Sequence, residues 1–193
     1  MYFLKRFIKY YKPYKAVFFI DMFCAMIVSL VDLAFPQILN LLTNHLFTQN
    51  AELILKSLPW LGLGLLVMYI VRYLGRYYIT YQGHVMGARM ESDMRQELFD
   101  QYQRLSFSYY DQNNTGEMMS KLVSDLFDIS ELAHHGPENI FISILKIIGS
   151  FILLLLINIP MTLILLAVTV LMLVFSVNQN KKMRAVFMDN RRK

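Results

Sequence analysis

The stretch SFSYYDQNNTGEMMSK, residues 106–121, is a short polar interruption between two long helical runs. The chain around it is strongly apolar, because hydrophobic residues make up 56% of the 193 residues and the mean hydropathy is +0.40. This composition exceeds the apolar share of an ordinary soluble domain and places the chain in lipid. We therefore expect residues 106–121 to be the part that contacts a soluble partner.

The run before this turn, from about residue 53 to 105, is compatible with one helix. About 50 helical residues would span about 75–80 Å, more than twice the thickness of a hydrocarbon core. Its second half must then stand in the cytosol. Glu91 with Arg95 and Asp100 with Arg104 have the i,i+4 spacing of ion pairs on a solvated helix, which supports this interpretation.

Two glycines and two arginines of this run indicate how it packs and where it meets the membrane surface. Gly83 and Gly87 are spaced to let another backbone approach closely. Arg72 and Arg76, one turn apart near the inner leaflet, either line a cavity or extend to lipid phosphates, and the second is the simpler interpretation.

Residues 16–44 form the first expected crossing. An ionisable group that faces lipid costs about 2.5–3.5 kcal/mol, so polar residues here should face protein or a wet cavity. At 100° per residue they all fall within an arc of about 100°. This polar stripe faces either a translocation path or the packing contact with another helix, and both interpretations remain open. Its members are Asp21, Ser29, Asp32, Pro36, Asn40 and Thr43.

The run after the turn predicts two more crossings, over residues 117–157 and 160–193. Asn114 followed by Glu117 is a capping-box-like helix start. Lys121 and Asp125 have i,i+4 spacing and are expected to pair.

The ends of the chain are basic. Residues 1–15 alternate aromatic and basic side chains, which predicts an interfacial helix ended by Pro13. The net charge of +5 lies beside the apolar runs and not on one polar face, so no nucleic-acid partner is expected. Cations are scarce in the outer loops, which predicts a multi-pass protein with both ends cytoplasmic. Cys24 is interpreted as inert packing.

His134, His135 and Glu138 are the one group that could offer metal ligands. The pattern lacks the HExxH arrangement, and Gly136-Pro137 should disrupt the helix that would align the ligands. His84 and His45 are interpreted as distant. We therefore expect a helix kink and no metal site, with an intramembrane metalloenzyme as a weak alternative.

The turn resembles the first intracellular turn of the transmembrane domain of ABC exporters. Tyr109 and Tyr110 match the aromatic pair of that family, and Asp111 and Thr115-Gly116-Glu117 follow as in its motif. The next helix has the family pattern Met/Leu-x-Ser-Lys/Arg-Leu-x-x-Asp, filled by Met119, Ser120, Lys121, Leu122 and Asp125. The resemblance implies an all-α membrane fold of long helices that extend into the cytosol, here with four of the family's six crossings.

The resemblance also implies a function. Residues 106–116 would be a coupling turn that docks on a nucleotide-binding domain, in a bacterial cell-membrane exporter of the multidrug or lipid half-transporter type that pairs with a second half. Its substrate would be hydrophobic or amphipathic. The implied contact residues are Tyr110, Asp111, Gln112, Asn113, Asn114, Thr115 and Gly116, and the candidate path residues are Asp21, Ser29, Asp32, Asn40, Arg72 and Arg76.

The chain departs from the family in two respects. It has four crossings, and it contains no GxxxxGK[ST] phosphate loop, so this chain is not expected to be an ATPase or to bind a cofactor. ATP and Mg²⁺ would be held by a nucleotide-binding domain beyond residue 193 or on another chain. We expect an N-terminal fragment of a membrane domain, by design or from a truncated gene. The alternatives are a self-contained four-helix membrane scaffold and a nonfunctional truncated transporter.

Overall fold

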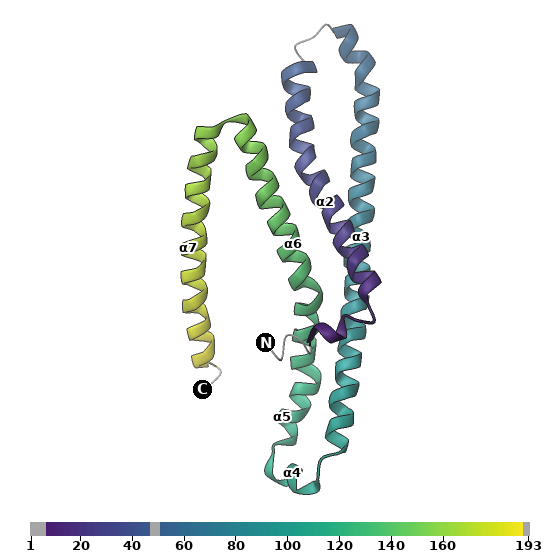
Figure 1. Ribbon diagram of the computed structural model, residues 1–193, viewed down its shortest axis with the longest axis vertical. Helices are drawn as coiled ribbons and strands as arrows, with labels where there is room; N and C mark the ends of the chain where they lie inside the picture. The colour runs from purple at the N-terminus through teal and green to yellow at the C-terminus, as the bar shows by residue number, and fades with distance from the viewer. Residues whose placement is uncertain (1–6, 47–50, 191–193) are drawn as a thin grey trace. The chain divides into compact units, whose positions relative to one another are not determined.

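The computed structural model describes residues 7–46 and 51–190, which are almost entirely helical and contain no strand (Figure 1). Four described segments are long and apolar enough to cross a bilayer: Lys15–Asn44, Leu55–Gln103, Thr115–Ile157 and Ile159–Met188. The predicted all-α membrane fold is confirmed. Its helices are α2 (Lys15–Leu41), η1 (Leu42–Leu46), α3 (Ala51–Gln103), α4 (Phe107–Gln112), α5 (Thr115–Ser120), η2 (Lys121–Asp125), α6 (Leu126–Ile157) and α7 (Ile159–Asn190).

The chain forms two compact units, residues 1–146 and 147–193, and each is described by itself. In the first unit α2 lies along α3 (Figure 1). The helices meet closely at Gly75, where an added Cβ would lie 2.8 Å from Cγ2 of Val28. Ala25, Val28 and Ile79 form the core of this contact, and Phe141 of α6 packs against them.

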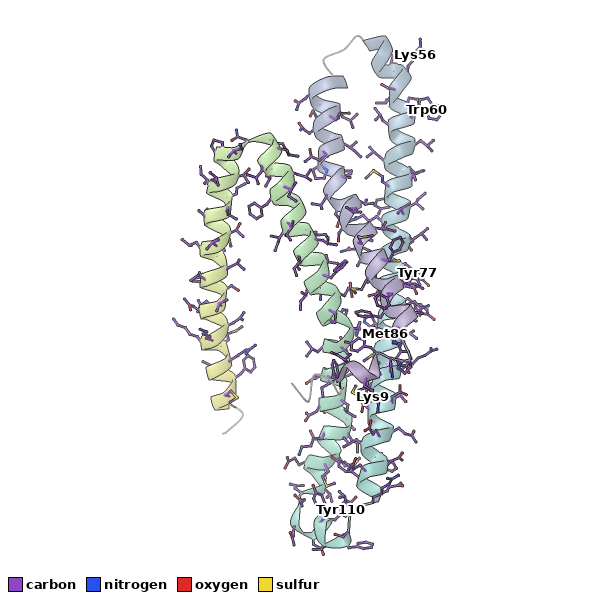
Figure 2. The ribbon with its side chains drawn as sticks, viewed as in Figure 1. Lys9, Lys56, Trp60, Tyr77, Met86 and Tyr110 are labelled. Atoms are coloured by element: carbon purple, nitrogen blue, oxygen red, sulfur yellow. The ribbon has the colours of Figure 1, made fainter. Side chains whose placement is uncertain are left out.

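The long helix is α3, a single helix of 53 residues, or about 80 Å. Figure 2 shows Lys56 near one end of this unit and Tyr110 near the other. Glu91 and Arg95 form the predicted ion pair, and Arg95 Nε also donates to the carbonyl of Leu122 at 3.1 Å. Asp100 and Arg104 form no ion pair within the described part of the chain, because α3 ends at Gln103, before Arg104.

The next helical run begins as predicted at Asn114, whose Oδ1 accepts the N–H of Gly116 at 2.8 Å. Glu117 pairs with Lys121 at 2.9 Å. The predicted pair of Lys121 with Asp125 is therefore wrong. These two residues bound the π-helical turn η2, and the wider turn removes the alignment of residues four apart.

The N-terminal segment crosses α3 and α6. Residues 7–10 are helical and the chain turns at 11–14, around Pro13, while residues 1–6 of the predicted interfacial helix lie outside the described residues. Phe7, Tyr11, Tyr14 and other aromatic side chains pack on a cluster of Met86, Met90 and Ala133. This segment is therefore part of the folded unit.

The prediction that Gly136-Pro137 disrupts its helix is wrong, because α6 continues through Pro137. Proline has no N–H, so the carbonyl of Ala133, four residues earlier, loses its helical donor. The hydroxyl of Tyr11 donates to that carbonyl at 2.5 Å. Burial raises the pKa of Tyr11 above its ordinary value of 10.0, so the hydroxyl keeps its proton at neutral pH. A side chain from the N-terminal segment thus replaces the missing helical bond.

The second unit contains a tight turn at Asn158, as predicted. Its Oδ1 accepts the N–H of Met161 at 3.1 Å, and Thr162 Oγ1 donates to its carbonyl at 2.7 Å. Asn158 therefore caps the start of α7.

Tyr11→Phe is expected to destabilise the protein by about 1–3 kcal/mol, because it leaves a buried carbonyl unpaired. In a Pro137→Ala background the helix supplies its own donor, so the same change should cost much less. Chemical denaturation in detergent micelles measures both differences. Equal costs in the two backgrounds would contradict the proposed replacement of the helical bond, and Tyr73→Phe, at a side chain 62% exposed, is the matched control.

Candidate functional site

The turn between α3 and α5 is built around α4, a six-residue helix with no buried residue. The hydroxyl of Tyr110 donates to the carbonyl of Tyr102 at 2.5 Å and ties α4 to the end of α3. Asn113 Nδ2 donates to the carbonyl of Tyr109 at 2.9 Å and satisfies the end of α4. The turn is therefore ordered by its own hydrogen bonds, while its outer surface is open.

The seven predicted contact residues lie together in this turn. Tyr110 is partly buried and serves as an attachment, whereas Asp111, Gln112, Asn113, Asn114, Thr115 and Gly116 are exposed. The exposed members therefore form a continuous polar surface at the end of the hairpin that α3 forms with α5, η2 and α6.

Sequence reasoning did not single out Phe107 in this surface. Its side chain is 91% exposed, the highest value among the large hydrophobic side chains of the described residues. Phe107 lies in α4, which follows the end of α3. The apolar part of α3 is at its other end, so Phe107 is far from the segment expected in lipid. The sequence did hold a signal for Phe107, because it is an aromatic residue at the start of a polar turn. An exposed aromatic side chain outside lipid is typical of a protein contact.

The polar stripe of α2 divides into two parts. Asp21 and Ser29 are buried, with 2% and 1% exposure, and Ser29 Oγ donates to the carbonyl of Ala25 at 2.8 Å. Asn40 is exposed, and its side-chain oxygen accepts from the amide of Asn44. The buried part therefore lies in the packing of the helices.

Asp32, between these two parts, accepts from two cations. Its Oδ1 is 2.6 Å from Arg72 Nε, and its Oδ2 is 2.6 Å from Lys146 Nζ. The interpretation that Arg72 extends to lipid phosphates is wrong, because Arg72 Nε donates to the Asp32 carboxylate on the neighbouring helix. Arg76, one turn on, is exposed.

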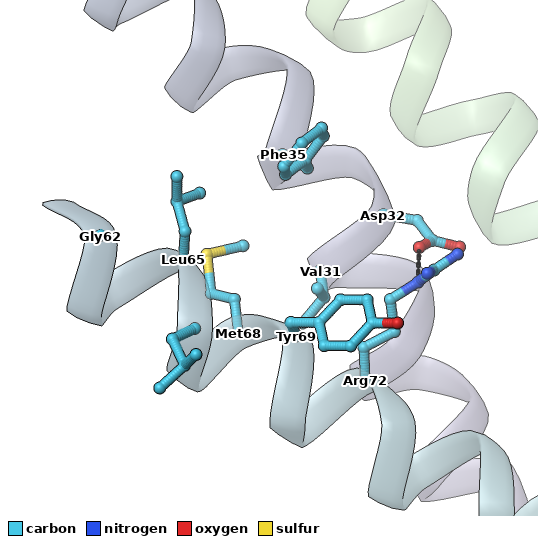
Figure 3. Close-up of a pocket in the computed structure, with 9 residues that line it drawn as sticks. Val31, Asp32, Phe35, Gly62, Leu65, Met68, Tyr69 and Arg72 are labelled. Carbon is cyan, nitrogen blue, oxygen red and sulfur yellow. Dashed lines mark hydrogen bonds and ion pairs between the residues drawn. The ribbon is translucent and has the colours of Figure 1, made fainter.

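A cavity of about 580 Å³ lies beside this ion-pair group, between α2 and α3 (Figure 3). Its walls are apolar apart from Asp32, Arg72 and the Tyr69 hydroxyl; the other lining residues are Val31, Phe35, Gly62, Leu65, Leu66 and Met68. A partly open cavity with apolar walls and a few convergent polar groups is typical of a small-molecule site.

Lys146 is the residue of this group that sequence reasoning missed. A signal was present, because Lys146 is the only charged residue from 139 to 177. A cation in so apolar a segment requires a counter-charge on another helix. The sequence does not say which carboxylate supplies it.

Three histidines come together at the junction of α3 and α6. The expectation that His84 is distant is wrong, because its ring centroid lies 4.7 Å from that of His134 and 5.3 Å from that of His135. The two helices are antiparallel neighbours here, which a linear spacing argument cannot detect.

Residues 18–191 match the family described as the ABC transporter transmembrane region. The chain belongs to this family. The family match thus covers nearly the whole chain, beyond the turn and the following helix whose residues carry the ABC exporter resemblance.

Among similar proteins, this transmembrane region is 40% identical over 185 residues to a Bacillus subtilis (strain 168) protein named "Uncharacterized ABC transporter ATP-binding protein YwjA", covering 95% of the chain and 32% of that protein. It is 31% identical to an "ATP-dependent lipid A-core flippase" of Idiomarina loihiensis over 66% of the chain and 21% of the relative. It is 24% identical to the "Putative multidrug export ATP-binding/permease protein YgaD" of Bacillus subtilis (strain 168), over 83% of the chain and 28% of the relative. The chain spans about a third or less of these relatives.

The ion-pair group predicts an unequal response to mutation. Asp32→Ala leaves two cations without a partner and should destabilise the transmembrane region by about 3 kcal/mol. Lys146→Met leaves Asp32 paired with Arg72 and should cost within about 1 kcal/mol. Thermal unfolding in lipid nanodiscs measures both changes. A Lys146→Met variant less stable than Asp32→Ala would show that Asp32 is not the shared partner.

Proposed function

We propose that this chain is the membrane-spanning part of an ATP-driven ABC exporter, which lines the translocation path and transmits the state of a nucleotide-binding domain through α4. The observation that carries the proposal is the exposed surface of α4, with Phe107 91% exposed at the end of a hairpin far longer than a bilayer. A groove on the nucleotide-binding domain would receive Phe107 and the polar residues from Asp111 to Gly116.

The hairpin has the connections that such transmission needs. Arg95 joins α3 to η2 through the carbonyl of Leu122, at 3.1 Å. The N-terminal segment joins the same helix, because Tyr14 donates to Asp93 at 2.9 Å and Tyr10 donates to Glu97. A force on α4 would therefore move the cytosolic part of α3 together with η2 and the start of α2.

The energy would come from the partner. A shift from 1:99 to 99:1 between two conformations takes about 5.5 kcal/mol, which ATP binding supplies when the closed domains contact α4 differently in the two states. ATP and Mg²⁺ would be bound by the nucleotide-binding domain, because these 193 residues contain no GxxxxGK[ST] loop. A second half-transporter would complete the path.

The substrate class follows from the cavity beside Asp32. Apolar walls with one carboxylate and one guanidinium fit a hydrophobic or amphipathic molecule. The names of relatives, a lipid A-core flippase and a putative multidrug export protein, support the same class. Both chain ends would face the cytoplasm of a bacterial cell, since the outer loops are poor in cations.

Site-specific crosslinking tests the proposed partner. In a Cys24→Ala background, Gln112→Cys in native membranes is expected to crosslink to a nucleotide-binding domain, with a yield that changes when ATP is added. Ser92→Cys, exposed on α3 away from the turn, is the matched control and should not give this product. If Gln112→Cys reacts with a soluble thiol reagent but captures no such domain, a scaffold that binds another protein becomes the better proposal.

Phe107→Ser should reduce substrate-stimulated ATPase activity of the assembled transporter by about 10-fold or more, because hot-spot aromatic residues contribute about 2 kcal/mol or more to a contact. Basal folding should be unchanged, since the side chain packs on little of its own chain. Ser108→Ala, an exposed neighbour in α4, is the control. Full stimulation of ATPase activity in Phe107→Ser would exclude Phe107 from the contact.

A further inference from the structure

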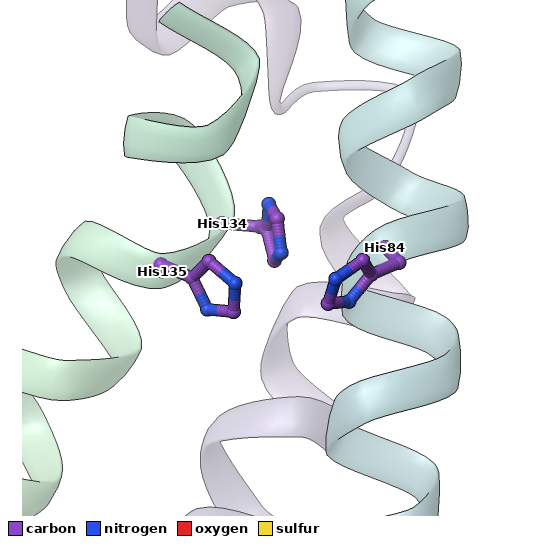
Figure 4. A group of neighbouring side chains, drawn as sticks. All are labelled: His84, His134 and His135. Atoms are coloured by element: carbon purple, nitrogen blue, oxygen red, sulfur yellow. The ribbon is translucent and has the colours of Figure 1, made fainter. Parts of the chain in front are cut away.

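The histidines of the α3–α6 junction form a group with the chemistry of a metal site. His84 comes from α3, and His134 and His135 come from α6 (Figure 4). One ligand nitrogen of each ring lies within 4.8 Å of the others. Three imidazoles are a ligand set that suits Zn²⁺.

A hydrogen bond from Nδ1 of His134 leaves its Nε2 as the nitrogen that could bind a metal. Its Nδ1 lies 3.2 Å from the carbonyl of Ser130, and a carbonyl only accepts, so Nδ1 carries the proton. Nε2 then holds a lone pair. This atom is buried, with the residue only 3% exposed, and has no hydrogen-bond partner among the described residues. A buried acceptor without a partner is unfavourable unless a ligand occupies it.

His84 has the same arrangement. Its Nδ1 lies 2.8 Å from the carbonyl of Thr80, which leaves Nε2 as the atom with a free lone pair. A backbone carbonyl that fixes the tautomer and turns Nε2 outward is the usual outer-shell partner of a metal-binding histidine.

Two glycines of α3 make the recess for the His134 ring. A Cβ at Gly87 would lie 2.9 Å from His134 Nδ1, and a Cβ at Gly83 would lie 3.3 Å from its Cδ2. The spacing of Gly83 and Gly87, which predicted a close backbone approach, thus admits an imidazole. No larger residue fits at position 87 without moving this ring.

Two carboxylates, those of Glu131 and Glu138, lie next to the three histidines. His135 Nδ1 is 3.7 Å from Glu138 Oε2, and its Nε2 is 3.7 Å from Glu131 Oε2. Glu138 is nearly buried, at 9% exposure, and lies one helical turn from His134. It is in place to act as a fourth ligand or to orient His135.

We propose that His84, His134 and His135, with Glu138, bind a Zn²⁺ ion that joins α3 to α6. Tetrahedral zinc places imidazole nitrogens about 3.3 Å apart, so the rings must close by about 1.5 Å. The rings of His84 and His135 can turn inward, because His84 is exposed and His135 is partly exposed, while His134 stays fixed in its recess. Bound zinc would hold together the two helices that carry the α4 turn.

Zinc binding is tested on the intact protein without a histidine tag, in lipid nanodiscs. Isothermal titration with ZnCl₂, and Co²⁺ titration followed by visible absorption, should give one ion per chain and a tetrahedral Co²⁺ spectrum. His84→Ala alters an exposed side chain and should weaken binding by more than about 100-fold, whereas Glu138→Gln should weaken it by about 10–100-fold. Zn²⁺ should raise the thermal unfolding temperature of the unmodified protein and not of His84→Ala.

Two matched controls separate this site from nonspecific binding. His45→Ala removes the fourth histidine of the sequence and should leave binding unchanged. Gly87→Ala moves the His134 ring and should weaken binding, whereas Gly64→Ala, where an added Cβ meets nothing within 4 Å, should not. The proposal is overturned if the unmodified protein binds no Zn²⁺, or if His84→Ala and Gly87→Ala bind Zn²⁺ as tightly as the unmodified protein does. Neither result depends on whether α4 docks on a nucleotide-binding domain.

Discussion

The length of α3 relative to a bilayer is the constraint on which the first unit depends. A hydrocarbon core is about 30 Å thick, and a helix of 53 residues extends for about 80 Å. More than half of α3 must therefore leave the lipid, where a lone helix would be marginal in water. The structure covers this part with η2, the start of α6 and the N-terminal segment, and α4 closes the hairpin beyond them. An exposed turn far from the membrane is the direct result.

Two polar groups within the helical packing are satisfied by residues distant in sequence. Asp32 accepts from Lys146, which is 114 positions away, and the Ala133 carbonyl accepts from Tyr11, 122 positions away. Neither lipid nor a tightly packed helix contact offers water to replace such a partner, so each polar group holds its helices in a defined register. His84 of α3 also meets His134 of α6, but through ring contact, and the buried Nε2 of His134 has no hydrogen-bond partner within the described chain.

Local features of the fold were predictable, because the residues that cause them are close in sequence. The turn after α3 and the cap at Asn114 follow from side chains within a few positions, and Glu91 reaches Arg95 along one helix face. The wrong predictions have two origins, one local and one distant in sequence. Lys121 does not pair with Asp125, because a π-helical turn changes the local periodicity. The continuity of α6 through Pro137 depends on a hydroxyl from the other end of the unit.

The sequence by itself determined that the chain lies in a membrane, how its crossings divide it, and where a polar turn interrupts the long helices. Hydropathy, helical periodicity and capping are properties of neighbouring residues, and a resemblance in the turn pointed to the family that the whole chain matches. Only the tertiary structure decided that Arg72 and Lys146 share Asp32, that Tyr11 repairs the helix at Pro137, and that His84 meets His134. These pairings depend on the rotation and register of packed helices. Side chains far apart in the chain set that register together, so no single stretch of sequence contains it.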